Sequence, residues 1–286
     1  MASPIDPIRT LQTTHRFTIG GVPVGGSAPL VVIAGPCVLE NLEHALDLGR
    51  ELKAICERQG LGYVFKASYD KANRSSNSSF RGLGLERGLE ILSRVKAELN
   101  VPVLTDVHTE EQVPAVAEVV DILQIPAFLS RQTDFVQAVG RGGKPVNVKK
   151  AQFMAPEDIQ NVVQKLQEVG CEDVLLTERG VSFGYHNLVT DFRSLPIMQH
   201  LSGKPVCFDA THSVQQPGGL GKSSGGRREF VPILARASCA VGIHALFLET
   251  HRTPDSAPSD GPNMLHLQDV EPLLAQCGAI RRALFS

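Results

Sequence analysis

The chain has 286 residues, of which 42% are hydrophobic and 20% charged, and its formal net charge is -2. This length and composition predict a soluble globular protein with a large core, built either as an α/β barrel or as two domains. The near-neutral charge argues against a protein that binds nucleic acid, and the apolar stretches are too short for the ~20 residues of a membrane-spanning helix.

The N-terminal segment carries no targeting signal. It begins MASPIDPIRT, without the basic start and apolar middle of a signal peptide, so we expect a cytoplasmic protein with no membrane or nucleic-acid partner. Residues 17–26, FTIGGVPVGG, are typical of a two-stranded hairpin that turns at Gly20 and Gly21. We expect this hairpin to cover the N-terminal mouth of a barrel formed by the residues that follow.

Eight short apolar runs, rich in β-branched residues, follow the hairpin. Such runs are typical of parallel strands that are buried on both faces. Helix-period segments separate several of them, for example at 41–59, 84–99 and 156–170. Eight strand and helix alternations without a linker predict a (β/α)8 TIM barrel that forms one domain over residues 1–286. An open doubly wound sheet is the alternative, but no GxGxxG follows the first run. The eight runs are 31–37, 62–68, 102–107, 121–127, 145–150, 173–179, 205–211 and 245–251.

Basic residues stand at or just past the ends of these runs. A cation at the end of a buried strand is costly unless an anion meets it, so this placement predicts a phosphate or carboxylate site. Asn73 and Ser75 close to the first of these cations suit a phosphate monoester, although a solvated basic loop is the competing interpretation. In a barrel the later cations would converge on the same mouth. The basic residues are Lys66, Lys71, Arg74, Arg131, Lys149, Lys150 and Arg179.

A second group comprises Cys37, His212, Glu249 and Asp260. They stand at the ends of the first, seventh and eighth runs and in the loop after the eighth. A barrel places its eighth strand beside its first, so these four residues become neighbours and offer a mixed site for Zn²⁺, Fe²⁺ or Mn²⁺. Each residue also has an ordinary explanation, such as a core cysteine or a hydrogen-bonded loop histidine. The six cysteines form no CxxC pair and are expected to be reduced thiols.

Taken together, these motifs resemble one family, the 3-deoxy-D-manno-octulosonate 8-phosphate (KDO 8-phosphate) synthases, also called 2-dehydro-3-deoxyphosphooctonate aldolases. The resemblance runs in order over residues 33–264 and covers most of the chain. The matching stretches are AGPCVLEN, FKASYDKANRSS, TDVH, LQIPAFLSRQTD, VNVKKAQFMAP, TERG, FDATHSVQQPGG, LETH and SDGPNM.

The resemblance implies a transferase that condenses phosphoenolpyruvate with D-arabinose 5-phosphate and water, giving KDO 8-phosphate and phosphate for lipopolysaccharide synthesis. It implies that Arg131 reaches a neighbouring subunit's site in a homo-oligomer, a tetramer. Cysteine at position 37 is similar to the metal-dependent branch, which implies a divalent ion (Zn, Fe or Mn) on the four residues above. The phosphoenolpyruvate residues implied are Lys66, Lys71, Lys149 and Arg179, the sugar-phosphate residues are Asn73, Arg74, Ser75, Asp106 and Gln124, and the catalytic residues are Lys71, Asp106, Lys149, His212 and Asp260.

Two other functions compete with this one. The related 3-deoxy-D-arabino-heptulosonate 7-phosphate synthases use erythrose 4-phosphate. Their motif at this place resembles KPRTS, whereas this chain has KANRSS, so Asn73 favours the longer sugar. A barrel that binds phosphosugars without catalysis is the second alternative. The full set of cations and metal-ligating residue types argues against such a loss of activity.

Overall fold

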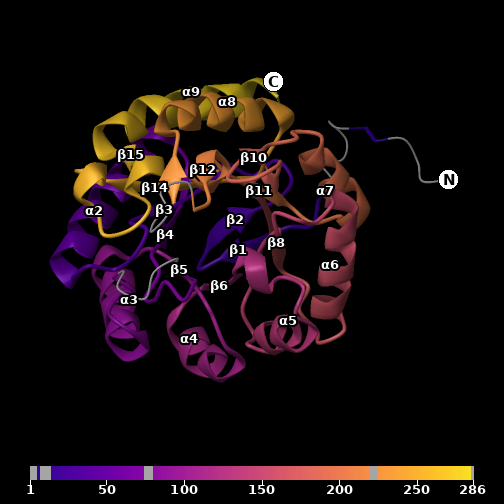
Figure 1. Cartoon of the computed structure of the whole chain (residues 1–286), viewed down its shortest axis with the longest axis horizontal. Coiled ribbons are helices and arrows are strands. Elements are labelled where there is room, and N and C mark those ends of the chain that lie inside the picture. The colour runs from indigo at the N-terminus through magenta and orange to yellow at the C-terminus, as the bar shows by residue number, and fades with distance from the viewer. Residues whose placement is uncertain (1–4, 7–13, 74–79, 219–223, 285–286) are drawn as a thin grey trace.

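The computed structural model of the chain describes residues 5–6, 14–73, 80–218 and 224–284. Eight parallel strands pair in chain order, and β11 then pairs with β14 while β14 pairs with β3, so the sheet closes on itself. Figure 1 shows the helices as an outer ring around these strands. The predicted (β/α)8 barrel is therefore confirmed. Its strands are β3 (Val31–Gly35), β4 (Gly62–Lys66), β5 (Val103–Asp106), β6 (Ile122–Ile125), β7 (Val146–Lys149), β8 (Val174–Glu178), β11 (Val206–Asp209) and β14 (Ala245–His251).

Alternate residues of each strand face two different cores. In β3, Val31 and Ile33 belong to a cluster inside the barrel, whereas Val32 and Ala34 pack in the layer between strands and helices. Successive side chains of a strand point to opposite faces, and both faces of this sheet are covered. This explains why the runs are apolar throughout rather than alternating. The same alternation decides where each polar side chain at a strand end points.

The predicted helices form an amphipathic ring. Asn41 caps the first of them by accepting a hydrogen bond from the backbone N–H of His44 at 2.8 Å, and Gly60 ends it in the left-handed conformation. The expected 156–170 segment begins as the 3₁₀ turn η3 (Pro156–Asp158) before its α-helix. The helices are α2 (Leu42–Gln59), α3 (Leu85–Leu99), α4 (Val113–Val119), α5 (Thr133–Gly140), α6 (Ile159–Gln167), α7 (Ser194–Ser202), α8 (Val231–Val241) and α9 (Val270–Ala283).

The N-terminal hairpin closes the bottom of the barrel. Strands β1 (Phe17–Ile19) and β2 (Val22–Val24) pair antiparallel around the two predicted glycines. Phe17 and Ile19 are buried in the cluster inside the barrel, and Figure 1 shows both strands across its centre. The hairpin therefore acts as the expected cover. The chemistry is left to the opposite, C-terminal mouth, as is usual in this fold.

Short elements decorate the loops at the C-terminal mouth. β15 extends the sheet beside β14, while two small antiparallel pairs form in the loops after β8 and β11. In the described part of the chain, no helix is long and apolar enough to cross a membrane. The short strands are β9 (Val181–Ser182), β10 (Leu188–Val189), β12 (Gln215–Gln216), β13 (Gly225–Gly226) and β15 (Leu265–His266), and the remaining 3₁₀ turns are η1 (Glu110–Gln112), η2 (Ala127–Leu129), η4 (His212–Val214), η5 (Arg228–Phe230), η6 (Pro254–Ser256), η7 (Gly261–Asn263) and η8 (Leu267–Asp269).

Candidate active site

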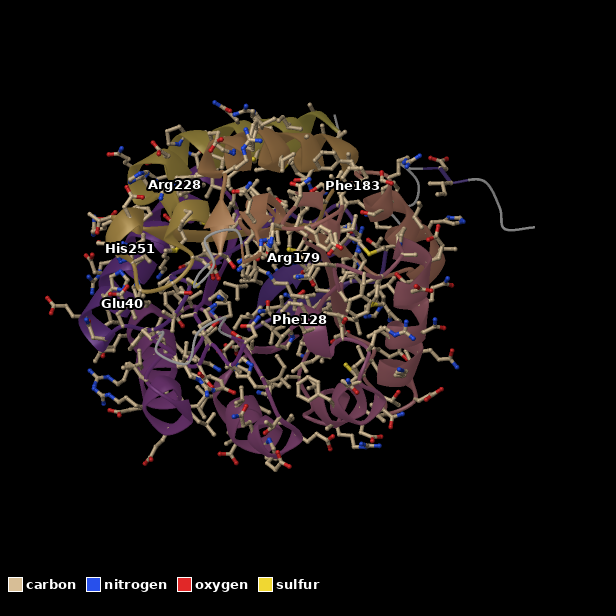
Figure 2. All side chains as sticks on the ribbon, in the orientation of Figure 1. Glu40, Phe128, Arg179, Phe183, Arg228 and His251 are labelled. Atoms are coloured by element: carbon tan, nitrogen blue, oxygen red, sulfur yellow. The ribbon has the colours of Figure 1, made fainter. Side chains whose placement is uncertain are left out.

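A cavity of about 590 Å³ opens at the C-terminal ends of the strands. It is large enough for two small phosphorylated molecules. Most of its polar lining residues continue the inward-facing positions of their strands, so alternation brings them together from distant parts of the sequence. Figure 2 labels Arg179 near the centre of this mouth, with Phe128 beside it. The predicted residues that line the cavity are Lys66, Lys71, Asn73, Asp106, Gln124, Lys149, Arg179, His212, Glu249 and Asp260.

Two buried lysines lie around one aromatic ring. Lys149 forms an ion pair with Asp209 and places its Nζ 3.4 Å from the centre of the Phe247 ring. Lys66 Nζ donates to Glu249 Oε1 at 2.6 Å and lies 5.5 Å from the same ring. Burial lowers the pKa of Lys149, although Asp209 opposes this shift. The ring and the carboxylates hold both ammonium groups at the cavity wall.

Arg179 is held for an anion. It is buried, and its Nη2 donates to Gln215 Oε1 at 3.0 Å. Its Nη1 is also buried and has no hydrogen-bond partner among the described residues. A guanidinium with a free, buried donor is costly unless an acceptor comes to it. A phosphate or carboxylate in the cavity would supply that acceptor.

A polar group lies at the ends of β4 and β5, beside Lys66. Asp106 accepts a hydrogen bond from Ser68 Oγ at 2.5 Å and lies 3.3 Å from His108 Nε2. Burial raises the pKa of Asp106, but His108, Lys71 and Lys66 outweigh it and hold the pKa at about 2. Asp106 is therefore ionised at neutral pH and can accept hydrogen bonds from hydroxyl groups.

Three of the four predicted metal ligands lie in contact. Cys37, Glu249 and Asp260 each offer a ligand atom, and these atoms lie within 4.8 Å of one another. Cys37 Sγ is 3.1 Å from Asp260 Oδ2. Glu249 Oε2 is buried and has no hydrogen-bond partner among the described residues. A buried carboxylate oxygen that accepts no hydrogen bond is costly unless a cation binds it. The sulfur and oxygen ligands at this place fit a divalent metal ion.

His212, the fourth predicted ligand, is oriented toward the same place. Its Nε2 lies 3.7 Å from Glu249 Oε2, while its Nδ1 lies 2.7 Å from Asp209 Oδ2. A carboxylate behind one ring nitrogen fixes the ring and leaves the other nitrogen free, the arrangement common among metal-binding histidines. The ring proton is assigned to Nδ1 on this geometry.

The thiol of Cys37 needs a cation to become a ligand. Burial, and next the charge of Glu249, raise the pKa of Cys37 well above its usual value. A thiol is a metal ligand only when it is deprotonated, and a divalent ion itself provides the charge that favours the thiolate.

Asp260 has φ 51°, a left-handed conformation that is uncommon for a residue other than glycine.

Formal charges in the lining nearly cancel. Among the described lining residues there are four cationic side chains and four carboxylates. Two phosphorylated substrates would add several negative charges to this neutral set, so further positive charge is needed to bind both. A divalent ion at Cys37 would be one source of that charge. The cationic side chains are Lys66, Lys71, Lys149 and Arg179, and the carboxylates are Asp106, Glu249, Asp255 and Asp260.

Two of the seven basic residues lie elsewhere. Lys150 faces the outer layer, where its Nζ is 3.5 Å from Glu178 Oε2 and donates to the carbonyl of Met154 at 2.9 Å. The expectation that Lys150 joins the mouth is wrong, because it has the opposite parity to Lys149. Arg131 is exposed and does not line the cavity. Arg74 and Ser75 lie outside the described residues.

Sequence reasoning missed several neutral contributors. Phe247 supplies the ring between the two lysines, Ser68 binds Asp106, and Gln215 binds both Arg179 and Asp260. Phe247 stands two residues before Glu249 and therefore has the same inward parity, a signal that was present in the sequence. Gln215 lies in a loop, where no periodic pattern identifies its direction.

Known proteins are similar to this chain over most of its length. Residues 8–284 match the model of a family described as the DAHP synthetase I family. A 2-dehydro-3-deoxyphosphooctonate aldolase of Desulfosudis oleivorans is 58% identical over 270 residues, covering 94% of this chain and 97% of that protein. A protein of the same name from Bradyrhizobium sp. is 58% identical over 90% of this chain and 90% of that protein. Another, from Geobacter sulfurreducens, is 57% identical over 93% of this chain and 98% of that protein.

Proposed function

This chain belongs to the KDO 8-phosphate synthases of the DAHP synthetase I family, and from that premise we propose that it condenses phosphoenolpyruvate with D-arabinose 5-phosphate and water. One C–C bond forms, between the methylene carbon of phosphoenolpyruvate and the aldehyde carbon of the sugar phosphate. Water adds to the enol carbon, the aldehyde oxygen takes up a proton, and phosphate leaves that former enol carbon. The products are KDO 8-phosphate, a precursor of lipopolysaccharide, and inorganic phosphate.

Phosphoenolpyruvate binds the cationic wall of the cavity. The observation that carries this assignment is the buried Nη1 of Arg179, which lacks an acceptor among the described residues. Lys149 and Lys66 line the same cavity, and Lys71 lies 4.0 Å from Glu249. Burial opposes the charge on Lys71, but Cys37 and Glu249 raise its pKa, so Lys71 stays protonated. Phosphate and carboxylate oxygens then replace water as the partners of these cations.

Arabinose 5-phosphate binds polar side chains of the same cavity. Asn73, Asp106 and Gln124 line it, and Asn147 Nδ2 orients the Gln124 amide by donating to its Oε1 at 2.9 Å. An ionised carboxylate and an oriented amide suit sugar hydroxyls, which act as donors and acceptors. Arg74 and Ser75 are assigned to the sugar's phosphate on their place in the KANRSS motif.

The side chains around the reacting atoms hold both substrates and the protons between them. Lys71 and Lys149 keep positive charge near the phosphate that leaves, while Asp106 faces the sugar. His212 and Asp260 also line the cavity, and we assign them to the protonation of the aldehyde oxygen. Holding two reactants in register is worth on the order of 7 kcal/mol of barrier, so we assign positioning the larger share of catalysis.

The metal-dependent branch is the one that this donor set fits. Cys37, His212, Glu249 and Asp260 would hold a divalent ion, with Zn, Fe and Mn as the candidates. Such an ion, when bound, supplies a Lewis acid that polarises a carbonyl oxygen or lowers the pKa of a bound water. The chain's own part is to fix the ligands, which Asp209 does for His212 and Ser259 does for Asp260.

We assign the active form to a homo-oligomer, a tetramer. Arg131 is exposed and does not line its own cavity, which leaves it free to enter a neighbouring subunit's site. Large apolar side chains are exposed as well, including Phe128 (54%), Phe153 (63%) and Phe183 (69%), and a subunit contact would cover such surface. Light scattering of the purified protein measures the subunit number, and a monomer with full activity would overturn this assignment.

Phosphate release tests the proposed reaction. The protein is incubated with phosphoenolpyruvate and either arabinose 5-phosphate, erythrose 4-phosphate or no sugar. We expect phosphate to be released with arabinose 5-phosphate at least ten times faster than in the other two arms. A preference for erythrose 4-phosphate would identify the heptulosonate synthase instead. No release with either sugar, in protein reloaded with Zn²⁺ or Mn²⁺, would indicate the non-catalytic barrel.

A further inference from the structure

A second group of metal-ligating side chains lies outside the cavity. Glu40, His44 and His251 each offer one ligand atom, and the three atoms lie within 4.8 Å of one another. None of the three lines the active-site cavity. In Figure 2, Glu40 and His251 are labelled close together at the edge of the barrel beside α2, away from Arg179 in the mouth. The proposed catalytic ligands and this group therefore form two separate clusters.

The two imidazole rings converge on the Glu40 carboxylate. Glu40 Oε1 lies 3.1 Å from His251 Nε2 and 3.7 Å from His44 Nδ1. The centres of the two imidazole rings are 4.7 Å apart. Two imidazole nitrogens and a carboxylate oxygen are a common ligand set for Zn²⁺ and for neighbouring divalent metals. Shifts of about an ångström would bring the three atoms to bonding distance of one ion.

His44 provides the second observation. Both of its ring nitrogens are buried, and neither has a hydrogen-bond partner among the described residues. Buried imidazole nitrogens are usually hydrogen-bonded or bound to a metal, because leaving them unpaired is costly.

The surroundings tolerate a cation. Arg252, the neighbouring positive charge, is bound by Asp47 Oδ2 at 2.8 Å and by Glu51. The backbone N–H of Thr253 donates to His251 Nδ1 at 3.0 Å, so the ring proton sits on Nε2 and faces Glu40. An ion that binds Nε2 takes the place of this proton, which moves to Nδ1; the bond from the Thr253 N–H is then given up, and Thr253 Oγ1 at 3.5 Å is the nearby acceptor. These contacts leave Glu40 as the charge that an ion would meet.

We propose that Glu40, His44 and His251 form a second divalent-cation site, structural rather than catalytic, that takes Zn²⁺ or a metal of similar preference. Glu40 follows Cys37 by three residues, and His251 follows Glu249 by two. An ion at this site would tie the segment after β3 to the end of β14, the two segments that also carry two of the proposed catalytic ligands. The ion would thereby stabilise the barrel mouth from outside the cavity.

Metal counting separates the two sites. Metal-free wild type, His44→Gln, Cys37→Ser and the control His200→Gln are dialysed against buffered Zn²⁺, and bound zinc per chain is measured. We expect His44→Gln to bind one ion fewer than wild type, and His200→Gln, whose substitution lies in the remote helix α7, to match wild type. Cys37→Ser should keep the ion at the second site.

Cobalt gives a readout that does not depend on the folding of the His44 variant. Cys37→Ser loaded with Co²⁺ should show visible bands without a thiolate-to-cobalt charge-transfer band, as expected of nitrogen and oxygen ligands. An unchanged zinc count in folded His44→Gln, or complete loss of metal in Cys37→Ser, would overturn the second site. A wild type that binds one ion, lost in His44→Gln and kept in Cys37→Ser, would instead refute the catalytic metal alone.

Discussion

Lys149 and Lys150 are adjacent, both are buried, and both pair with a carboxylate, yet they belong to different regions of the molecule. Lys149 faces the inside of the barrel and meets Asp209 and the Phe247 ring at the cavity wall. Lys150 faces the layer under the helices, where it forms an ion pair with Glu178. Glu178 also accepts a hydrogen bond from Ser194 Oγ. One peptide unit therefore separates a side chain suited to chemistry from one that holds the scaffold. Strand parity, rather than charge or burial, decides which is which.

Replacing the inner lysine sharpens this comparison most strongly. Lys149→Met removes one of the cations assigned to phosphoenolpyruvate and keeps an apolar side chain that reaches as far as the lysine Cε. We expect kcat/KM to fall by on the order of a thousandfold, the scale seen when one preorganised charge contact is lost. Steady-state phosphate release measures the effect. Activity within tenfold of wild type would remove Lys149 from the site.

Replacing the outer lysine should reverse the pattern. Lys150→Met leaves Glu178 without its ion-pair partner and removes the donor to Met154. We expect the free energy of unfolding to fall by about 3 kcal/mol, with kcat of the folded fraction within a few-fold of wild type. Urea unfolding and active-site-normalised kinetics measure the two quantities. A large loss of kcat with unchanged stability would break the distinction between the two regions.

Turnover after metal removal reports on the inner region, because only the proposed ion at Cys37 lies at the cavity. Chelation of the purified protein should reduce turnover on the order of a hundredfold, and Zn²⁺, Fe²⁺ or Mn²⁺ should restore part of it. Cys37→Asn should retain less metal than wild type while its phosphoenolpyruvate affinity changes little. Elemental analysis accompanies each assay. Full turnover by protein shown to hold no metal would refute the cofactor while leaving the proposed reaction in place.

The smallest effect concerns a carboxylate of the mouth. The pKa of Asp106 is depressed to about 2 from its ordinary value of 3.8. A depressed carboxylate stabilises the fold above its unfolded pKa, and the contribution of about 2 kcal/mol is lost as pH falls from about 4 to 2. The stability difference between wild type and Asp106→Asn should therefore shrink by roughly 1 kcal/mol between pH 6 and pH 3. A pH-independent difference would contradict this origin.

Much of this molecule could be predicted from sequence, for physical reasons that differ between its parts. The eight strands were visible because both faces are buried, and the cations at their ends were visible because buried charge needs a partner. Charge alone puts Lys149 and Lys150 at one site, whereas the parity of the strand from Val146 onward directs them to opposite faces. Loop residues such as Gln215 and Ser259 carry no period, so only the fold reveals that they bind Arg179 and Asp260.

A crystal structure of the Mn²⁺-loaded protein with phosphoenolpyruvate would test whether the cations and the metal ligands form one site, with anomalous scattering locating the ion. We expect an ion bonded to Cys37 and Glu249 at the barrel mouth, and a phosphoenolpyruvate oxygen within hydrogen-bond distance of Arg179 Nη1. We also expect Lys149 to contact the ligand while Lys150 stays with Glu178. Phosphoenolpyruvate bound away from the C-terminal strand ends, with Arg179 turned from it, would show that these residues do not form the active site.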